Sequence, residues 1–336
     1  MTVVAGVSLL NGVIIAADCR LTVKSPGKAD IHSDTLQKLI PLTSTSVLGF
    51  CGDVGTAALI LREMRRQLRF RKRRDAISMY AWLPRFLRAC YRNLENRGKA
   101  RPVHFMIASV KPGYRNTVER KKVVELVNMI AQGTGCMQRN WLPVTLIQVL
   151  KTDPKHDYVS IPGTIAGLLY SLRAPDFTPH ITQPLECHVL GSGEGAIAEI
   201  RRSADWILAG PPGELSESLG LREAVSDFVS ENMIEDVGGM YPCLKIDQRG
   251  IIFIGMSFGL PGEEVSLKFD MRENRWRQKN HMTGKDMLLI FPWEVKAATI
   301  LKNNRFDDYI EKLSLFRTGP NKSEFDMVDR KPRNRQ

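Results

Sequence analysis

Residues near the start of the chain combine the groups needed for nucleophilic hydrolysis. Thr2 follows Met1 and precedes an apolar, β-branched run. Removal of Met1, which the small threonine side chain favours, would leave a hydroxyl and a free α-amine on one residue. An α-amine has an ordinary pKa of about 7.7–8.0, so a sizeable fraction of it accepts protons at neutral pH. Threonine with its own amine as base is a known nucleophile arrangement, although Met-Thr alone is weak evidence for one.

Asp18 and Lys38 are the candidates for the polar groups around Thr2. Two apolar runs, Val3–Leu10 and Val13–Asp18, are separated by Asn-Gly, which is typical of a type I′ hairpin turn. The hairpin would return Asp18 to within a few rungs of Thr2. A carboxylate that ends a buried strand needs a cationic partner, and Lys38 leads into the next apolar run. By spacing alone, a strand-end aspartate and an ordinary surface lysine remain the simpler interpretation.

The ordered set of these residues resembles the proteasome β-subunit family of N-terminal nucleophile hydrolases. The matching segments are TVVAGVSLLNGVIIAADCR, then Lys38, then GFCGDVGTA. Thr2 and Asp18 are 16 positions apart and Lys38 and Gly52 are 14 apart, as in that family. The resemblance, to a bacterial-type proteasome homologue with insertions, implies that Thr2 is the nucleophile and that Asp18 and Lys38 form the supporting ion pair. It also implies that the Gly52 N–H donates to the oxyanion.

Later segments carry the resemblance further. CHVLGSGEGAIAEIRR resembles the family's Gly-Ser-Gly before a helix, which would place Ser192 beside the nucleophile. The alternative is a plain strand-to-helix turn with serine as the helix cap. Val237 and Ile234 stand where the family has a serine and an aspartate before its Gly-Gly. This departure keeps open a catalytically inactive structural or assembly subunit.

Phe50 and Val54 flank Gly52 at two residues on either side. By resemblance they would line the pocket for the substrate side chain before the scissile bond. Both are apolar, which favours an apolar side chain there. Packing in the core of the protein explains the same two residues equally well.

The order of predicted elements indicates an α+β fold. Two strands form the N-terminal hairpin, a third covers 44–51, and helical periodicity follows over 57–68 and 76–94. Further strands and helices alternate in groups rather than as βαβ units. Together with the resemblance, this order predicts a four-layer αββα sandwich of two stacked, mainly antiparallel sheets. The later predictions are strands at 104–110, 158–161, 168–172 and 187–190, helices at 116–151, 196–208, 221–236 and 293–313, and hairpins at 242–258 and 264–282.

The resemblance also divides the chain. Residues 2–260 are expected to form the hydrolase domain, with a mostly helical insertion near 115–160. Residues 261–315 form a C-terminal extension, and the polar 316–336 segment is expected to be disordered.

Composition excludes several classes of protein. The chain has 336 residues, 43% of them hydrophobic, and no run of apolar residues long enough to span a membrane. Its six cysteines are widely scattered without a CxxC pair, which favours free thiols in the cytoplasm over a disulfide framework or a zinc site. No His motif suits a metal, and GSGEG does not complete a dinucleotide fingerprint.

The net charge of +12 raises nucleic acid as a partner. Half of it lies at 62–75, REMRRQLRFRKRRD, where eight basic residues face two acids for a local charge of +6. No nucleic-acid-binding motif accompanies this run, so a solvated helix end or a subunit contact is favoured. Charge reversal of Arg71, Lys72, Arg73 and Arg74 would test a nucleic-acid function.

The sequence therefore predicts a cytoplasmic threonine endopeptidase-type hydrolase that cleaves peptide bonds with Thr2 and assembles as a homo-oligomeric ring. No metal or organic cofactor is needed for this chemistry. The expected partners are a peptide or unfolded-protein substrate, further copies of the chain, and an unfoldase or an acidic protein. Nucleic acid and membrane are not expected.

Overall fold

The structure of the protein is a computed structural model. It describes residues 2–23, 30–71, 75–111, 115, 117–132, 141–152, 156–161, 166–192, 195, 197–198, 214–254, 256–260 and 263–295. In this part of the chain the fold is α+β, with several antiparallel sheets that do not close into a barrel. No helix in the same part is long and apolar enough to cross a membrane.

The first sheet contains the N-terminal hairpin at its centre. Its strand order is β12-β1-β2-β13-β14, and all neighbours run antiparallel. Both hairpin strands are buried along their whole length. The strands are β1 (Val3–Leu9), β2 (Gly12–Ala17), β12 (Cys187–Gly191), β13 (Cys243–Asp247) and β14 (Gly250–Ile254).

The second sheet contains the strand that ends at Gly52. Its order is β11-β10-β7-β6-β5, again antiparallel throughout. The strands are β5 (Leu39–Thr43), β6 (Ser46–Gly52), β7 (Val103–Lys111), β10 (Ala166–Arg173) and β11 (Pro179–Thr182).

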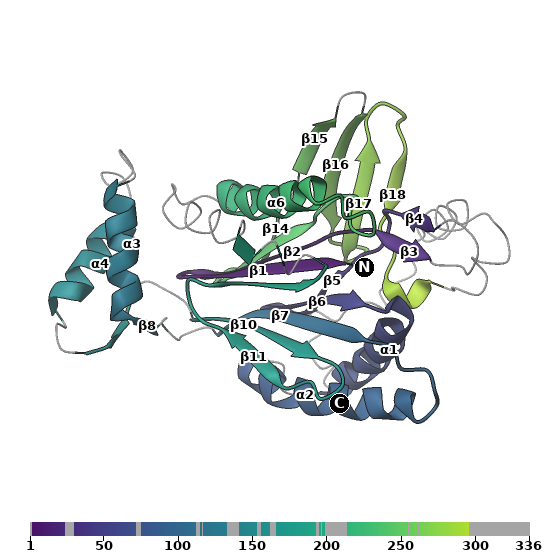
Figure 1. Cartoon of the computed structure of the whole chain (residues 1–336), viewed down its shortest axis with the longest axis horizontal. Helices are drawn as coiled ribbons and strands as arrows, with labels where there is room; N and C mark the ends of the chain where they lie inside the picture. Colours follow the sequence, from purple (N-terminus) through teal and green to yellow (C-terminus); the bar gives the residue numbers. More distant parts are fainter. Residues whose placement is uncertain are drawn as a thin grey trace, which may run out of the picture.

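The alternation of side chains explains why the hairpin strands are buried on both faces. Val4 and Ile15 point toward the second sheet and join a cluster with Val47. Val3 and Ile14, one residue earlier on each strand, join another cluster with α6 (Glu214–Glu231). Figure 1 shows α6 lying along one side of β1 and β2, and the second sheet on the other side.

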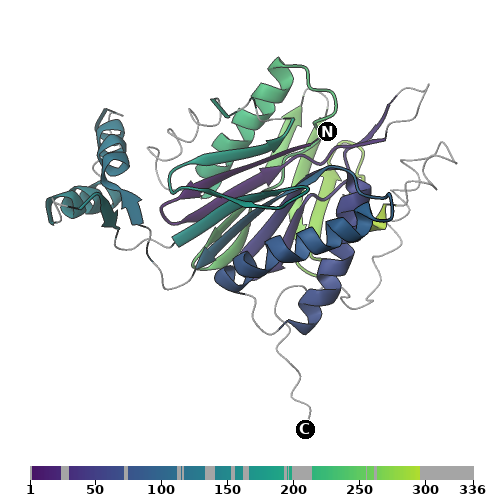
Figure 2. The ribbon, with the colours of Figure 1, turned by 60° about the horizontal axis from the view of Figure 1, so that its bottom comes forward.

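The helices α1 (Val54–Phe70) and α2 (Ala76–Glu95) cover the other face of the second sheet. Their apolar faces pack on side chains from β6 and β7, including Leu48 and Phe105, in a single buried cluster. Figure 2 shows both helices lying across the strands of this sheet. The helical periodicity of the sequence therefore marks the face of each helix that packs on the sheet.

A third sheet follows the strands of the two larger sheets in the sequence. Its order is β15-β16-β17-β18, and the neighbours are antiparallel. The strands are β15 (Met256–Leu260), β16 (Glu263–Asp270), β17 (Arg275–Asn280) and β18 (Asp286–Leu288), and the short 3-10 helix η2 (Pro292–Glu294) follows them. Trp276 and Phe269 of this sheet belong to the same buried cluster as Val4 and Ile15. The C-terminal sheet thus shares the core of the two larger sheets.

The region 117–160 forms a small unit beside the sheets. Its two strands, β8 (Thr117–Glu119) and β9 (Tyr158–Ser160), pair with each other. Between them in the sequence lie two helices, α3 (Arg120–Gln132) and α4 (Trp141–Thr152). Their apolar cluster includes Leu10 from the turn after β1. Both Figure 1 and Figure 2 show α3 and α4 to one side of the sheets.

The structure differs from the sequence predictions at several elements. The hairpin turn is one residue earlier than expected: Leu9 pairs with Gly12, so Leu10 and Asn11 are the turn residues, and of the Asn-Gly pair only Gly12 has positive φ, at 146°. The strands β5 and β11 and the short pair β3 (Leu21–Val23) and β4 (Ile31–Ser33) were not predicted. The predicted helices at 196–208 and 293–313 lie mostly outside the described residues, as does the tail at 316–336.

Candidate active site

The hairpin brings Asp18 to Thr2, as the sequence predicts. Val4 pairs with Ala17, which places Asp18 beside Val3 at the end of the ladder. The Asp18 N–H donates to the Val3 carbonyl at 3.2 Å, and the Val3 N–H donates to Asp18 Oδ1 at 2.9 Å. The carboxylate is thereby fixed against the residue that follows Thr2.

Lys38 completes a buried polar contact at this point. Its Nζ donates to Thr2 Oγ1 and to Asp18 Oδ2, each at 2.8 Å. The side chains of the ion pair are 0% exposed, and Thr2 as a residue is 3% exposed. The structure therefore brings Thr2, Asp18 and Lys38 together with an ammonium between a hydroxyl and a carboxylate.

The Asp18 carboxylate accepts hydrogen bonds from three groups of the protein. Besides Lys38 and the Val3 N–H, the Arg20 N–H donates to Asp18 Oδ2 at 3.1 Å. Burial raises the pKa of Asp18, while the Lys38 ammonium and the two backbone N–H groups act in the opposite direction. A buried charge is retained when it is paired and hydrogen-bonded in this way.

Gly52 lies at the end of β6, where the chain turns into α1. Its φ is +97°, and a Cβ at this position would come within 2.4 Å of the Pro102 carbonyl oxygen. Asp53 then caps the helix by accepting the Thr56 N–H at 2.6 Å. Unlike the strand residues before it, Gly52 is exposed. Its role as a donor to an oxyanion stays a prediction.

Ser192 lies next to Thr2 through its backbone. Its N–H donates to the Thr2 carbonyl at 3.0 Å, directly after β12 pairs with β1. Gly191 has a φ of +84°, and a Cβ there would come within 1.9 Å of the same carbonyl oxygen. The backbone contact accounts for the glycine, and a catalytic role for the Ser192 hydroxyl stays a prediction.

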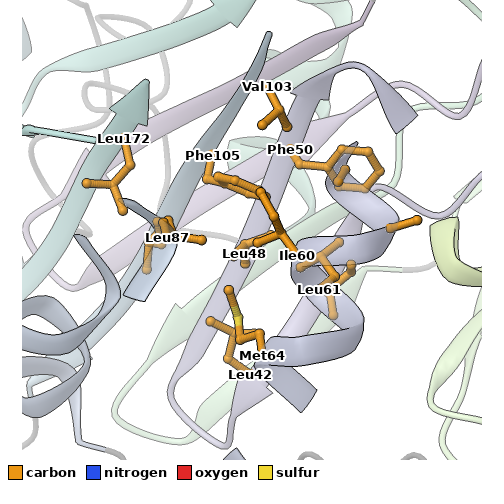
Figure 3. Close-up of a cluster of buried hydrophobic side chains, with 14 of the residues drawn as sticks. Leu42, Leu48, Phe50, Ile60, Leu61, Met64, Leu87, Val103, Phe105 and Leu172 are labelled. Carbon is orange, nitrogen blue, oxygen red and sulfur yellow. The ribbon is translucent and has the colours of Figure 1, made fainter. Parts of the chain in front are cut away.

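The two predicted pocket residues belong to the helix side of the second sheet. Phe50 is 0% exposed and packs in the cluster between β6, β7 and α1, where Figure 3 shows it beside Phe105 and Val103. Val54 begins α1 and packs partly against the same cluster. Contact of either residue with a substrate stays a prediction.

Arg20 and Asp34 form a second ion pair beside the first, which sequence reasoning missed. Arg20 Nε donates to Asp34 Oδ1 at 2.8 Å. Arg20 Nη1 also donates to the carbonyl oxygens of Glu235 at 2.8 Å and Val237 at 3.3 Å. This arginine joins the end of β2 to the loop after α6. Its position two residues after Asp18 was the only signal in the sequence.

The residues that depart from the family pattern pack in an apolar environment. Val237 is 2% exposed and belongs to the cluster between α6 and the first sheet, and Ile234 packs against that cluster. The loop that carries them provides the carbonyl oxygens of Glu235 and Val237 to Arg20.

The pKa values of two ionisable side chains that interact with Asp18 are shifted as well. Burial raises the pKa of the Cys19 thiol, and the Asp18 carboxylate adds to the effect. Burial likewise raises the pKa of Tyr241, with Asp18 as the next cause. Within the described residues, no group of three or more His, Cys, Asp or Glu side chains could hold a metal ion.

Comparisons with known proteins give limited matches. No protein-family model matches the chain, and no curated protein matches it. One similar solved structure is a Gly-1 mutant of Anbu from Hyphomicrobium sp. strain MC1, with a TM-score of 0.46 and 12% identity over 76% of this chain and 85% of that chain. Another is Anbu, described as an ancestral β-subunit, from Yersinia bercovieri, with a TM-score of 0.44 and 12% identity over 75% of this chain and 87% of that one.

These comparisons correct the family suggested by the sequence. The chain was expected to be a bacterial-type proteasome β-subunit homologue, but no family model matches it and the two solved structures described above are Anbu proteins. That family assignment is therefore wrong. With TM-scores below 0.5, the likeness to Anbu carries no conclusion about activity, which has to be argued from the contacts around Thr2.

Proposed function

We propose that the chain is a threonine-type peptidase or amidohydrolase whose nucleophile is the Thr2 hydroxyl. The observation that carries this proposal is the 2.8 Å contact between Lys38 Nζ and Thr2 Oγ1. An ammonium held in a buried site stabilises negative charge on the oxygen that it faces, because little water competes for the interaction. Asp18 in turn fixes the ammonium and balances its charge.

The proposed reaction has two stages and begins once the bond before Thr2 has been cleaved. Thr2 Oγ1 adds to the substrate carbonyl carbon while its proton passes to the freed α-amine. The Gly52 N–H donates to the oxygen that gains negative charge. The C–N bond then breaks and the leaving nitrogen takes the proton from the α-amine. Water adds to the carbonyl carbon of the resulting ester while one of its protons passes to the α-amine. The bond to Oγ1 then breaks, Oγ1 takes the proton from the α-amine, and the acid product leaves.

The architecture around this site supports a four-layer αββα arrangement. Separate apolar clusters lie between α6 and the first sheet, between the two sheets, and between the second sheet and the pair α1 and α2. We include in the proposal a peptide or unfolded-protein substrate and assembly of several copies into a ring. An unfoldase or acidic protein partner belongs to the same proposal.

Covalent labelling of Thr2 tests the proposed nucleophile. We expect a β-lactone probe to add its mass once per chain in wild type and in Thr2→Ser, and not in Thr2→Ala. Thr22→Ala is the matched control, since it removes a hydroxyl that contacts His32 on the β3–β4 pair instead. Turnover of fluorogenic peptides should follow the same order. The mass of the mature chain must show Thr2 at the N-terminus; undiminished turnover in Thr2→Ala would contradict the proposal.

A non-catalytic subunit on the same fold is the second candidate function. It is favoured by the 3% exposure of Thr2 and by the apolar packing of Val237 and Ile234. The labelling experiment separates the two functions. A chain with a free Thr2 amine that no threonine-directed probe modifies would be assigned to this second function.

A further inference from the structure

The segment that carries Lys38 is attached to the C-terminal sheet through the neighbouring residue, Gln37. The Gln37 side chain is 0% exposed. Its Oε1 accepts the backbone N–H of Trp276 on β17 at 3.0 Å, and its Nε2 donates to the Leu39 carbonyl at 3.1 Å. Both ends of the amide are therefore bonded, one to the C-terminal sheet and the other to the residue after Lys38.

The backbone on the same side is bonded to the C-terminal segment as well. The Gln37 N–H donates to the Ile290 carbonyl at 2.7 Å, and the Ile290 N–H donates to the Thr35 carbonyl at 2.8 Å. Leu36 and Ile290 form a parallel bridge between these contacts. The chain just before Lys38 thus pairs with the chain that follows β18.

On its other side, the segment is bonded to the strand end that carries Asp18. The Leu36 N–H donates to the Cys19 carbonyl at 3.0 Å. The chain directly before Lys38 is consequently held between two partners. One is the residue next to Asp18, and the other is the C-terminal sheet.

The C-terminal partner is itself firmly fixed. Trp276 is 0% exposed, and its ring packs edge-to-face on Phe269 with centroids 5.5 Å apart. Arg275 pairs with Glu294 at 3.1 Å, with side chains 1% and 6% exposed. Arg62 of α1 donates to the Trp293 carbonyl at 3.3 Å, which attaches the same segment to the helix that follows Gly52. This sheet can therefore act as a rigid support.

The position of the backbone matters because the lysine side chain is long and flexible. The ammonium faces Thr2 Oγ1 only when its Cα is held at the correct place and its stem is packed. A displacement of about 1 Å in a catalytic contact costs roughly 100-fold in rate. If the Gln37 amide only provided hydrogen-bond partners to buried backbone groups, its loss would lower the stability of the protein without changing the reactivity of Thr2.

We propose that Gln37 is a positioning residue through which the C-terminal sheet holds Lys38 against Thr2. The inference rests on the proposed function, since it concerns the group that would stabilise the Thr2 oxygen. It assigns to the extension after residue 260 a direct part in the geometry of the site. The connection that it requires consists of two hydrogen bonds, one donated by the Trp276 N–H to Gln37 and one donated by Gln37 to the Leu39 carbonyl.

The test compares Gln37→Met with Gln278→Met. Methionine keeps the length of the side chain but removes both hydrogen bonds of the amide. Gln278 is the control because it lies on the same strand, two residues after Trp276, and its buried Oε1 has no hydrogen-bond partner among the described residues. We expect Gln37→Met to slow β-lactone labelling of Thr2 by about 10- to 100-fold, and to shift the pH profile of labelling to higher pH. Gln278→Met should keep both at the wild-type values.

Folding and geometry are measured on the same proteins. Near-ultraviolet circular dichroism establishes that Gln37→Met is folded; if it is not, Gln37→Asn is used instead, because its shorter amide cannot reach both the Trp276 N–H and the Leu39 carbonyl. Crystal structures give the distance from Lys38 Nζ to Thr2 Oγ1, which should exceed the hydrogen-bond range of about 3.2 Å in the Gln37 variant.

Two outcomes would overturn the positioning role. One is an unchanged labelling rate and pH profile in folded Gln37→Met, and the other is an equal loss in Gln278→Met. A wild-type chain with a free Thr2 amine that is not labelled would refute the proposed function instead. In that case the Lys38–Thr2 distance still decides the inference, since an unchanged distance in Gln37→Met would contradict it.

Discussion

At the scale of single residues, the burial of the Lys38–Asp18 pair affects both the stability of the protein and the proposed chemistry at Thr2. The pair is completely buried, so removing one partner leaves the other as an uncompensated charge. The same burial strengthens the action of the ammonium on the Thr2 oxygen. Substitutions can separate these two effects. When Lys38 is removed, Asp18→Asn removes the remaining charge with little change in the shape of the side chain.

Lys38→Met is expected to lower the free energy of unfolding by about 3–5 kcal/mol and to abolish labelling of Thr2. The double variant Lys38→Met with Asp18→Asn should recover most of the stability, because no unpaired charge remains, but none of the labelling. Denaturant unfolding and intact mass after exposure to the probe measure the two quantities. A double variant that labels at the wild-type rate would show that the ammonium is not needed.

His188 gives the chain a pH dependence that is independent of the site. Burial, together with the nearby His180 and Arg173, lowers the pKa of His188 to about 4. Its ring lies 5.2 Å from that of His180, on the edge strands β12 and β11 of the two large sheets. Since an unfolded histidine has a pKa of about 6.5, the unfolded chain binds more protons between these two values. Stability should therefore fall as pH falls from about 6.5 to about 4.

We expect His188→Gln to reduce this loss. The free energy of unfolding, measured at pH 7 and pH 4.5, should differ less in the variant than in wild type. His281→Gln serves as the control, since His281 is exposed and bonded to Ser266 on the C-terminal sheet. If His188→Gln and wild type lose equal stability over this range, His188 is not the group responsible.

At the scale of elements, Gly52 at the junction of β6 with α1 is needed for its backbone conformation and, in the proposed reaction, for its N–H. Gly52 adopts a φ of +97° against the Pro102 carbonyl, and Asp53 caps the helix immediately afterwards. The direction of the Gly52 N–H is consequently fixed by the end of a strand and the start of a helix. The proposed oxyanion donor depends on this junction and not on a side chain.

Gly52→Ala should destabilise the protein by more than Gly98→Ala. Both glycines have positive φ, where alanine costs about 1–2 kcal/mol, but only at Gly52 would the new Cβ meet backbone, at 2.4 Å. At Gly98 nothing lies within 4 Å of the added atom. Chemical denaturation of both variants measures the difference, and Thr2 labelling should be lost only in Gly52→Ala. Equal losses of stability would mean that the junction relaxes without cost.

At the scale of the whole molecule, the C-terminal sheet is continuous with the core. Trp276 and Phe269 lie in the same apolar cluster as Val4 and Ile15 of the N-terminal hairpin. The Arg275–Glu294 pair is buried against Phe291, with the guanidinium 4.6 Å from the ring centre. Segments from the two ends of the described chain thus stabilise one interior, and neither is expected to remain folded without the other.

Glu294→Ala is expected to lower the free energy of unfolding by about 3–5 kcal/mol, because the Arg275 charge stays buried. The loss should appear in a single transition rather than as separate unfolding of the C-terminal sheet. For each protein, calorimetry and tryptophan fluorescence should then give the same midpoint as one another, and the midpoint of the variant should be the lower of the two proteins. Two separate transitions would show that β15–β18 unfold independently. Arg277→Ala is the control, since its pairs with Asp270 and Asp286 are partly exposed.

The sequence by itself determined the features that depend on neighbours along the chain. The apolar runs around the turn after β1 specify a hairpin buried on both faces, and its antiparallel pairing necessarily places Asp18 beside Val3 and close to Thr2. The periodicity of α1 and α2 likewise follows from local side-chain spacing. Lys38 could be named as a candidate partner because it leads into the next apolar run, although spacing alone favoured an ordinary surface lysine.

Only the tertiary structure decided how Lys38 is supported and what surrounds Asp18. Gln37 meets Trp276 at a separation of 239 positions, and Arg20 meets the Val237 carbonyl at a separation of 217. No periodicity or motif relates residues so far apart, because their meeting depends on how sheets and helices pack. The sequence therefore predicts a separate extension after residue 260. In the folded chain, this extension pairs with the segment that carries Lys38.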